Sequence, residues 1–508
     1  MWVYSNAQKH DNTWMWGDHP QYQDSTQFPY SGNEEATFLD TFKHYPKKRN
    51  IAFDAANTSY SDTAGNLELY TNGLWIFDTA GAIIPNGDSI GYGGLWEYCH
   101  QFTVGNDAGL ALYGAFAFVQ IAPTDSTIYL FHINVGLLEA PWNSYLNYTT
   151  IVKNPINGRY HVTRKNVAID STINTGGHLG VCRHGNGRDW WIIIMEAYSN
   201  CYHKYLLTKD SFYFVEKQCL GNVVPGGSGG KTVFSMSGKK MLRHTGFYNS
   251  AVFDFDRCNG RLSNPIIIDT FLPRDSTLGG ISDFFSSAEI ASNDSLVYMV
   301  AGYYIFQYHL YDADVNAGKD TVAIQDNFID SIIGAISAFD FSGYGPDGKI
   351  YISPTVACVF INTIEKPDLT GAACDFRRRK YRTYKNMPSS IPLFPNYRLG
   401  RKMGATCDTL YNGLPDGLKA AGRQPWMVPL PNPASQAVRF DYNWVEWDRY
   451  HHVKIQLTNA MGQNVASFVV PHYSSYYDAE LPNLPPGYYM ATLSGDDQIV
   501  TMCKLVIR

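Results

Sequence analysis

The chain has 508 residues and a formal net charge of -6, with 46 acidic and 40 basic side chains. This is more residues than one ordinary hydrophobic core supports, so we expect at least two domains or a large repeat fold. The weak negative charge excludes a general basic field for nucleic acid, and the lack of any run of 18 apolar residues excludes a transmembrane helix.

The composition favours β structure. Aromatic residues make up 15% of the chain and charged residues only 17%, and there are 44 glycines and 25 prolines. Tyrosine suits half-exposed pleated surfaces, while glycine and proline end strands at tight turns. We therefore predict an all-β fold of many short strands.

The first residues resemble the end of a signal peptide, with cleavage after Ala7. Residues 1–5 are too short for a complete secretory leader, which needs a charged and then an apolar region. We expect residues 1–7 to be the residual end of a signal peptide, either because the reading frame is longer or because the leader was lost when the start was assigned.

Residues 59–87 have the pattern of consecutive tight hairpins. Leu67 and Leu69 alternate with polar residues, and Asn72-Gly73 supplies a turn before the next apolar run. The segment resembles the opening blade of the WD-repeat-like propeller domain of large secreted Bacteroidota proteins. Glu68 is a small departure, since that family usually has an aromatic residue there.

Later segments resemble strands of the same family as far as residues 393–400. They are residues 128–133, 184–194, 234–241, 253–262, 306–312 and 345–352. The resemblance implies a β-propeller over residues 8–400. Because a four-stranded blade takes ~40 to 50 residues, we predict about seven blades.

None of the nine cysteines has CxxC spacing, so a zinc site has no support. Cys201 and Cys219 flank a predicted hairpin and would lie roughly opposite each other. This placement predicts a cross-strand disulfide in an oxidising compartment. The odd count leaves at least one cysteine without a partner in the chain.

Linear catalytic motifs are weak. Residues 226–230 match G-x-S-x-G, but a strand follows instead of the helix that would orient the serine, so we interpret them as a turn. A phosphate loop ending at Gly230-Lys231-Thr232 would need a glycine where Pro225 stands. Nucleotide binding is therefore not expected.

Two further polar groups have structural interpretations. His184, Arg188 and Asp189 could be imagined as a catalytic trio, but their spacing in a glycine-rich turn is better explained as a blade corner. The basic run 377–380 could bind phosphate, but we interpret it as a solvated loop.

One loop has the spacing of a calcium site. Its oxygen-bearing side chains are Asp312, Asp314, Asn316 and Asp320. Alternate side chains of such a loop can point at one hard cation, although the glycine falls one place late for an EF-hand and the final glutamate is absent. Ca2+ is the candidate cofactor, with a polar hairpin turn as the alternative. Asp254 and Asp256 are a weaker second candidate.

Aromatic clusters at residues 14–16, 190–191 and 473–477 could stack on sugars or fill the space between blades. The tripeptide Asp-Ser followed by Thr, Ile or Leu also recurs. It resembles the O-glycosylation acceptor of exported Bacteroidota proteins, and turn chemistry is the alternative. It begins at Asp24, Asp88, Asp125, Asp170, Asp275, Asp294 and Asp330.

Residues 401–428 have a linker composition, rich in glycine and proline and without strand alternation. Residues 429–508 return to strands: Val453, Ile455 and Leu457 alternate with polar residues before a turn at 459–462. This pattern predicts a small Ig-like antiparallel β-sandwich. A hinge in the linker would let the propeller move relative to it.

The order of these segments resembles the type A sorting domain of proteins exported by the type IX secretion system of Bacteroidota. The positions that carry the expected sorting signal are Pro433, Gly462, Gly487 and Lys504. The resemblance implies the secretion machinery as a partner, and a secreted or outer-membrane surface location in a Gram-negative bacterium.

Two classes of function remain open. The first is a surface protein that binds a glycan, a protein or its own copies, or that has a structural role. The second is a secreted hydrolase or lyase whose carboxylates converge in the propeller channel without a linear signature. An open channel with facing carboxylates would favour the enzyme, whereas an apolar plug would favour binding.

Overall fold

The computed structural model describes residues 9–18, 24–53, 55–101, 109–121, 125–136, 144–169, 173–224, 230–269, 285–330, 334–355, 358–387, 391–402, 404–408, 426–443, 450, 452–471, 474, 476–496 and 498–508. The expected signal-peptide end, most of the G-x-S-x-G segment and the larger part of the expected linker lie outside these ranges. So do the tripeptides that begin at Asp170 and Asp275.

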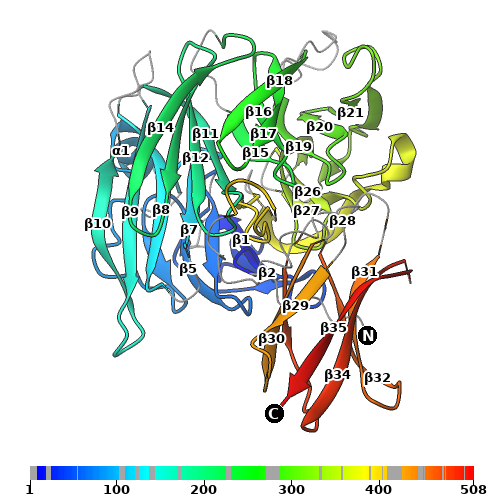
Figure 1. Cartoon of the computed structure of the whole chain (residues 1–508). Helices are drawn as coiled ribbons and strands as arrows, with labels where there is room; N and C mark the ends of the chain where they lie inside the picture. Colours follow the sequence, from blue (N-terminus) through cyan, green and yellow to red (C-terminus); the bar gives the residue numbers. More distant parts are fainter. Residues whose placement is uncertain are drawn as a thin grey trace.

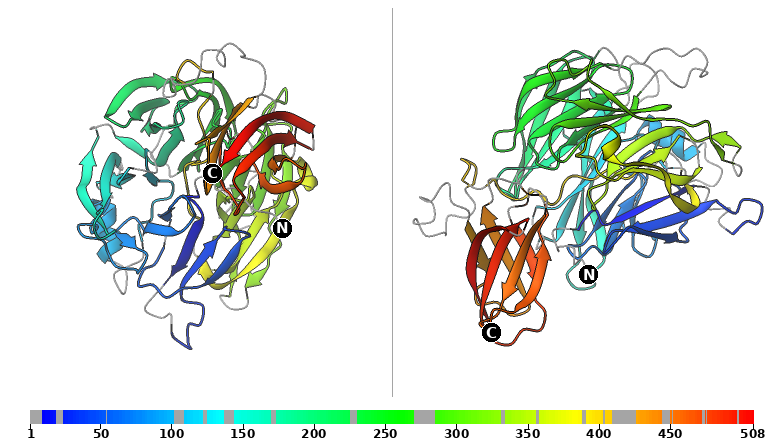
Figure 2. Two further views of the ribbon diagram at one scale, coloured as in Figure 1. Left: turned by 60° about the horizontal axis from the view of Figure 1, so that its bottom comes forward. Right: turned by 90° about the vertical axis from the view of Figure 1, so that its right-hand side faces the viewer.

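Seven antiparallel units surround one axis in the described part of the chain (Figures 1 and 2). The first four units contain β1 (Thr13–Asp18), β2 (Gly32–Thr37) and β3 (Lys43–Pro46); β4 (Thr58–Ser61), β5 (Leu67–Thr71) and β6 (Ile76–Asp78); β7 (Phe116–Val119), β8 (Thr127–Val135), β9 (Ser144–Lys153) and β10 (Tyr160–Ala168); and β11 (Asn174–Arg183), β12 (Trp190–Glu196), β13 (Cys201–Leu207) and β14 (Phe212–Cys219).

The last three units are four-stranded sheets. They contain β15 (Gly230–Phe234), β16 (Lys240–Thr245), β17 (Ser250–Asp256) and β18 (Arg261–Ile268); β19 (Phe285–Ile290), β20 (Leu296–Ala301), β21 (Tyr304–His309) and β22 (Asp320–Ile324); and β25 (Phe339–Tyr344), β26 (Ile350–Pro354), β27 (Cys358–Ile364) and β28 (Phe376–Met387).

Smaller elements lie between these units. One pair, Asn174 with Ser144, joins the third and fourth units into an eight-stranded sheet. The helix α1 (Gly94–Gln101) lies between β6 and β7. The short hairpin β23 (Ile329–Asp330) with β24 (Ala335–Ile336) precedes the last unit, and the 3-10 helix η2 (Gly371–Cys374) precedes β28.

The apolar run of β12 shows why these units stack. Trp190, Ile192 and Ile194 belong to the core shared with the third unit, whereas Trp191 and Ile193 belong to the core shared with the fifth. All five side chains are buried because a middle strand of a blade is covered on both faces. The seven units therefore form a propeller, which confirms the predicted fold class.

The ring closes between the first and last units. Trp14 and Trp16 pack with Tyr351 in one buried cluster. The carboxylate of Glu34 accepts hydrogen bonds from the backbone N–H groups of Tyr384 and Lys385, at 2.8 and 2.9 Å. The two ends of the propeller sequence thus hold each other directly.

A separate β-sandwich follows the propeller and lies against one end of it (Figure 2). One sheet contains β29 (Trp426–Leu430), β30 (Ala437–Asn443) and β33 (Tyr476–Glu480), and the other contains β31 (Val453–Thr458), β32 (Asn464–Val469), β34 (Gly487–Gly495) and β35 (Gln498–Ile507).

The sandwich has its own core. Val453, Ile455 and Leu457 are buried, while the residues between them are half-buried, as the alternation predicts. Within the described ranges, no helix has the length and apolar character needed to cross a membrane.

Candidate functional site

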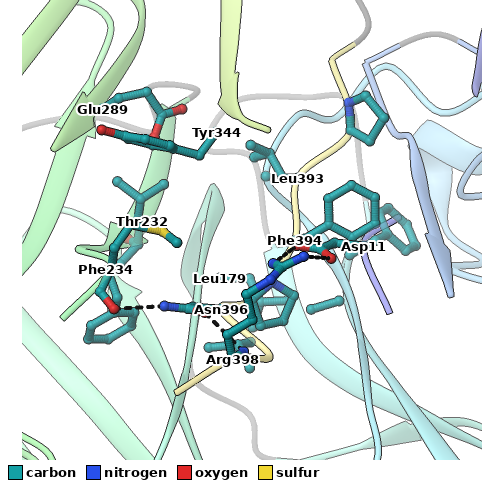
Figure 3. A pocket seen from close by; sticks show the side chains of 18 of the residues that line it. Asp11, Leu179, Thr232, Phe234, Glu289, Tyr344, Leu393, Phe394, Asn396 and Arg398 are labelled. Carbon is teal, nitrogen blue, oxygen red and sulfur yellow. Dashed lines mark hydrogen bonds and ion pairs between the residues drawn. The ribbon is translucent and has the colours of Figure 1, made fainter. Parts of the chain in front are cut away.

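The central channel of the propeller contains a segment of the chain itself. Residues 391–398 follow the last blade and pass between the innermost strands (Figure 3). β7, β11, β15, β19 and β25 supply the facing walls. Pro392 and Pro395 have no backbone N–H, so this segment cannot pair as a regular strand.

Hydrogen bonds to several blades fix the segment. The carbonyl of Leu393 accepts from Thr58 Oγ1 at 3.2 Å, in the second blade. Asn396 Nδ2 donates to the Met236 carbonyl at 2.8 Å, after β15 of the fifth blade. These bonds cross the channel, so the segment joins blades that are far apart in the sequence.

The lower end of the segment is fixed more strongly. The Tyr397 side chain is only 1% exposed, and its hydroxyl donates to the carbonyl of Phe118 at 2.7 Å. Arg398 forms a two-pronged ion pair with Asp11, with Nη2 and Oδ1 at 2.7 Å (Figure 3). A bidentate arginine–carboxylate pair is directional as well as strong.

The space left in the channel is small. A cavity of about 90 Å³ remains between the segment and the strands. Phe116, Leu179, Val181 and Phe394 line it with apolar surface, and Glu289 is its one carboxylate besides Asp11. Both carboxylates already have a cationic partner, Asp11 in Arg398 and Glu289 in Lys231.

Glu289 has a buried partner in Lys231. Lys231 Nζ lies 2.5 Å from Glu289 Oε1 and also donates to the Ser342 carbonyl at 3.0 Å. Burial lowers the pKa of Lys231 and raises the pKa of Glu289, because both charged forms have lost water. Tyr113, stacked on Phe341 at 3.7 Å, closes the channel beside the pair. The pair holds blades together and has little room for a substrate.

The chain leaves the channel along the fourth and fifth blades. Arg257 Nη2 donates to the carbonyl of Gly400, and the backbone N–H of Lys402 donates to the carbonyl of Gly185. Burial lowers the pKa of Arg257 to about 10, so it stays charged at neutral pH. A disulfide between Cys258 and Cys407 follows. The first part of the expected linker is thus bonded to the propeller.

The Cys258–Cys407 disulfide was not predicted, whereas the predicted pair lies in the fourth blade. Cys201 of β13 is directly opposite Cys219 of β14, and their sulfurs are 1.96 Å apart. The other described cysteines are thiols outside these two disulfides: Cys99, Cys182, Cys358, Cys374 and Cys503.

The calcium-loop residues lie between β21 and β22, and the structure does not bring them together around one point. Asn316 Oδ1 accepts from the N–H of Asp269, and Asp314 Oδ1 accepts from the N–H of Asn316. Asp320 pairs with His309 at 2.9 Å. Among the described residues there is no group of three or more His, Cys, Asp or Glu side chains placed to hold a metal.

The turn after β11 has the structural arrangement expected of a blade corner. Arg188 Nε and Asn186 Nδ2 both donate to the Asp189 carboxylate at 2.7 Å. His184 Nε2 contacts the carbonyl of Cys258 at 2.9 Å. In the basic run, Arg379 pairs with Asp326 at 2.7 Å. None of these groups faces a described cavity.

The aromatic clusters are mostly interior. Trp14, Trp16, Trp190 and Trp191 are at most 2% exposed, so they fill the space between blades and cannot stack on a sugar. Tyr477 is buried in the sandwich core.

The predicted sorting positions lie at turns and edges of the sandwich. Gly462 has φ +78° in the turn that Asn459 closes, and Gly487 begins β34. Lys504 places its ammonium 3.7 Å from the centre of the Tyr488 ring. Pro433 precedes Ala434, which bridges to the end of β35.

Residues 430–508 match the family model described as a secretion system C-terminal sorting domain. This match supports the type IX sorting signal that the sequence predicted, so the chain is exported to the outside or to the cell surface. The secretion machinery is therefore a partner of the sandwich. No curated protein matches the chain.

Solved structures resemble the propeller part. A Bacteroides fragilis protein described as a candidate 6-phosphogluconolactonase has a TM-score of 0.41 at 12% identity, covering 74% of this chain and 96% of its own. The periplasmic gluconolactonase of Pseudomonas aeruginosa has a TM-score of 0.34 at 12% identity, covering 80% and 94%. The Swd1 β-propeller domain of Myceliophteria thermophila has a TM-score of 0.30 at 9% identity, covering 76% and 94%. The activities in these names belong to those proteins.

Proposed function

We propose that this chain is a surface-attached binding or adhesion protein of a Bacteroidota bacterium, exported by the type IX secretion system. The observation that supports binding over catalysis is the channel filled by residues 391–398. A hydrolase or lyase with its site in the channel would need that space for its substrate. The blade edges and connecting loops remain as the surfaces that meet a ligand.

Attachment to the outer membrane is part of the proposal. The sandwich carries its sorting positions on turns and edges, where a secretion component can reach them. The propeller is bonded to Gly400 and Cys407, which precede the sandwich in the chain. Recognition for export and ligand binding are therefore assigned to different parts of the chain.

O-glycosylation is also proposed, at the Asp-Ser tripeptides. Ser126 is exposed beside β8, and Ser25 and Ser89 are half-buried in turns. Hydroxyl groups at such positions are open to modification after export. The intact mass of the exported protein should exceed that of the mature chain, and an equal mass would exclude the modification.

The export experiment uses a Bacteroidota host with a working type IX system. The full chain and a chain ending at residue 428 are each expressed, and intact cells are treated with protease. We expect the full chain to be digested on the surface and the shortened chain to stay protected inside. Equal surface exposure of the two would contradict the proposal.

The binding experiment adds labelled purified protein to cells that lack the gene. We expect saturable attachment to the cells or their matrix, since the proposed role is adhesion. Turnover of glycan or peptide substrates without attachment would favour the enzyme instead.

A further inference from the structure

A second cavity lies between the second and third blades, away from the channel. Its volume is about 380 Å³, in the lower part of the roughly 300–1,000 Å³ range of small-molecule sites. Strands β4, β5, β8, β9 and β10 and the turns between them line it. The lining groups used below are His10, Tyr60, Glu68, Gln120, Lys153 and Tyr160.

His10 forms one wall and is only 3% exposed. Its Nδ1 is hydrogen-bonded to the carbonyl of Ser61, and its ring stacks on Tyr60 at 4.7 Å. A carbonyl can only accept, so Nδ1 carries the proton and Nε2 has the free lone pair. Burial lowers the pKa of His10 to about 4, so the ring is neutral at physiological pH.

The contact with Ser61 uses Nδ1, which leaves Nε2 as the ring nitrogen of His10 that can accept a hydrogen bond from a ligand. A nearly buried imidazole with an unused lone pair in the wall of a cavity is an acceptor prepared for a ligand donor. A hydroxyl group would satisfy it without bringing in a charge.

A pair of opposite charges also lines the cavity. Lys153 Nζ lies 2.9 and 3.1 Å from the two carboxylate oxygens of Glu68. The same ammonium lies 5.0 Å from the centre of the Tyr160 ring. Because Glu68 and Lys153 neutralise each other, they present fixed polar groups to the cavity with no net charge.

Tyr60 donates to Gln120 Oε1 at 2.6 Å, which fixes the amide. Gln120 Nε2 in turn donates to the carbonyl of Asp125 at 2.6 Å. The carboxylate of Asp62 is occupied by the N–H groups of its own turn. The cavity therefore combines the Tyr160 ring with neutral or paired polar groups.

This combination selects a class of ligand. The Glu68 carboxylate and the hydrogen-bond acceptors would repel a phosphate or carboxylate ligand. The Lys153 ammonium would repel a cationic ligand. A sugar has hydroxyl groups for acceptor and donor positions, and C–H faces that pack on aromatic rings. We propose that this cavity binds a neutral sugar unit, with His10 Nε2 and the Glu68–Lys153 pair bonding its hydroxyl groups and the Tyr160 ring packing on one of its faces.

The inference rests on the proposed binding function and names its ligand. The test uses the purified, disulfide-bonded full chain and four neutral disaccharides: cellobiose, maltose, lactose and diacetylchitobiose. Saturation-transfer NMR detects binding, and titration gives Kd. We expect at least one of them to bind, and Lys153→Met to weaken its Kd about tenfold or more, since a hydrogen bond to a charged group is lost. Lys153→Arg should recover part of the affinity.

The matched control is a tyrosine substitution at another groove. Tyr213, 46% exposed on β14, lines an aromatic groove between the third and fourth blades. Tyr213→Leu should leave Kd unchanged, whereas Tyr160→Leu should abolish binding. Because Tyr160 is 9% exposed and its variant could misfold, Lys153→Met, at a side chain 42% exposed, keeps the test valid.

Binding to none of the four sugars would overturn the inference, as would a Kd unaffected by Lys153→Met or lost in Tyr213→Leu. These outcomes are separable from failure of the proposed function. If the chain attaches to cells but binds no sugar, only the sugar site is wrong. If the chain binds sugar but is not exported, the sugar site stands and the surface role is wrong.

Discussion

The propeller and the sorting sandwich differ in the sequence separation of the contacts that hold them together. In the sandwich, β31 pairs with β32 across one short turn, and its apolar residues alternate as a half-buried strand requires. In the propeller, Asp11 pairs with Arg398, 387 residues away, and residues 391–398 fill the axis. The sandwich thus depends on local pattern, whereas the propeller needs both ends of its sequence.

The largest expected effect comes from shortening the chain on either side of this closing segment. A chain ending at residue 408 should keep the propeller's melting temperature within a few degrees. A chain ending at residue 387 should fail to fold, because it loses the buried Tyr397 and Leu399, each at 1% exposure. Removing one large buried side chain already costs about 3–5 kcal/mol of the roughly 5–15 available.

Circular dichroism melts of the two shortened chains provide the measurement. Equal cooperative transitions would mean that the ring closes without its central segment. The propeller would then not need both ends of its sequence.

The next effect concerns the buried pair beside the channel. Lys231→Met leaves Glu289 buried without its partner, which should lower the unfolding free energy of the propeller by about 3–5 kcal/mol. The double variant Lys231→Met/Glu289→Leu should recover part of that loss. Urea unfolding followed by fluorescence measures both. A loss below about 1 kcal/mol in the single variant would show that the pair is not desolvated.

Acid should destabilise the propeller through its buried histidines. Burial lowers the pKa of His132 to about 3, and His10 and His178 are also lowered, to about 4 and about 3. Between about pH 6.5 and pH 3 the unfolded chain binds a proton at His132 that the folded chain refuses, so stability falls as pH falls. The slope is up to about 1.4 kcal/mol per pH unit for this group.

Unfolding free energies measured from pH 7 to pH 4 test this dependence. His132→Asn should flatten the propeller's slope relative to the unchanged chain. An identical slope in the variant would assign the acid sensitivity to other groups.

The smallest effect belongs to the sandwich. Gly462 has φ +78°, and a Cβ there would meet nothing within 4 Å, so Gly462→Ala adds only backbone strain of about 1 kcal/mol. Calorimetry should show the sandwich transition lowered and the propeller transition unmoved. A shift of both transitions would mean that the two regions unfold as one unit.

The sequence predicted those parts that depend on neighbours in the chain. The alternation from Val453 to Leu457 and the hairpins of residues 59–87 appear as strands because period-two patterns and glycine turns are local signals. The helix α1, of 8 residues, was not predicted, since one short turn-flanked helix gives no long periodic run. The match of Cys201 with Cys219 also follows from a single hairpin.

The channel segment and the sugar cavity could not be predicted in this way. Residues 393–400 were recognised as the end of the propeller, but neither Pro392 nor Pro395 indicates in the sequence that the chain enters the central channel. His10 was placed next to an expected cleavage site and assigned no role. His10 contacts Ser61 and Tyr60, about 50 residues further on. Contacts between residues so far apart produce no periodic pattern in the sequence.

The most direct test of the central claim is hydrogen exchange of the peptide spanning residues 391–400 in the native full chain. We predict that its amides, including that of Leu399, exchange as slowly as those of the inner strands, at rates set by unfolding of the whole propeller. Exchange within seconds would show that the segment leaves the channel under native conditions, and would reopen the channel as a catalytic site.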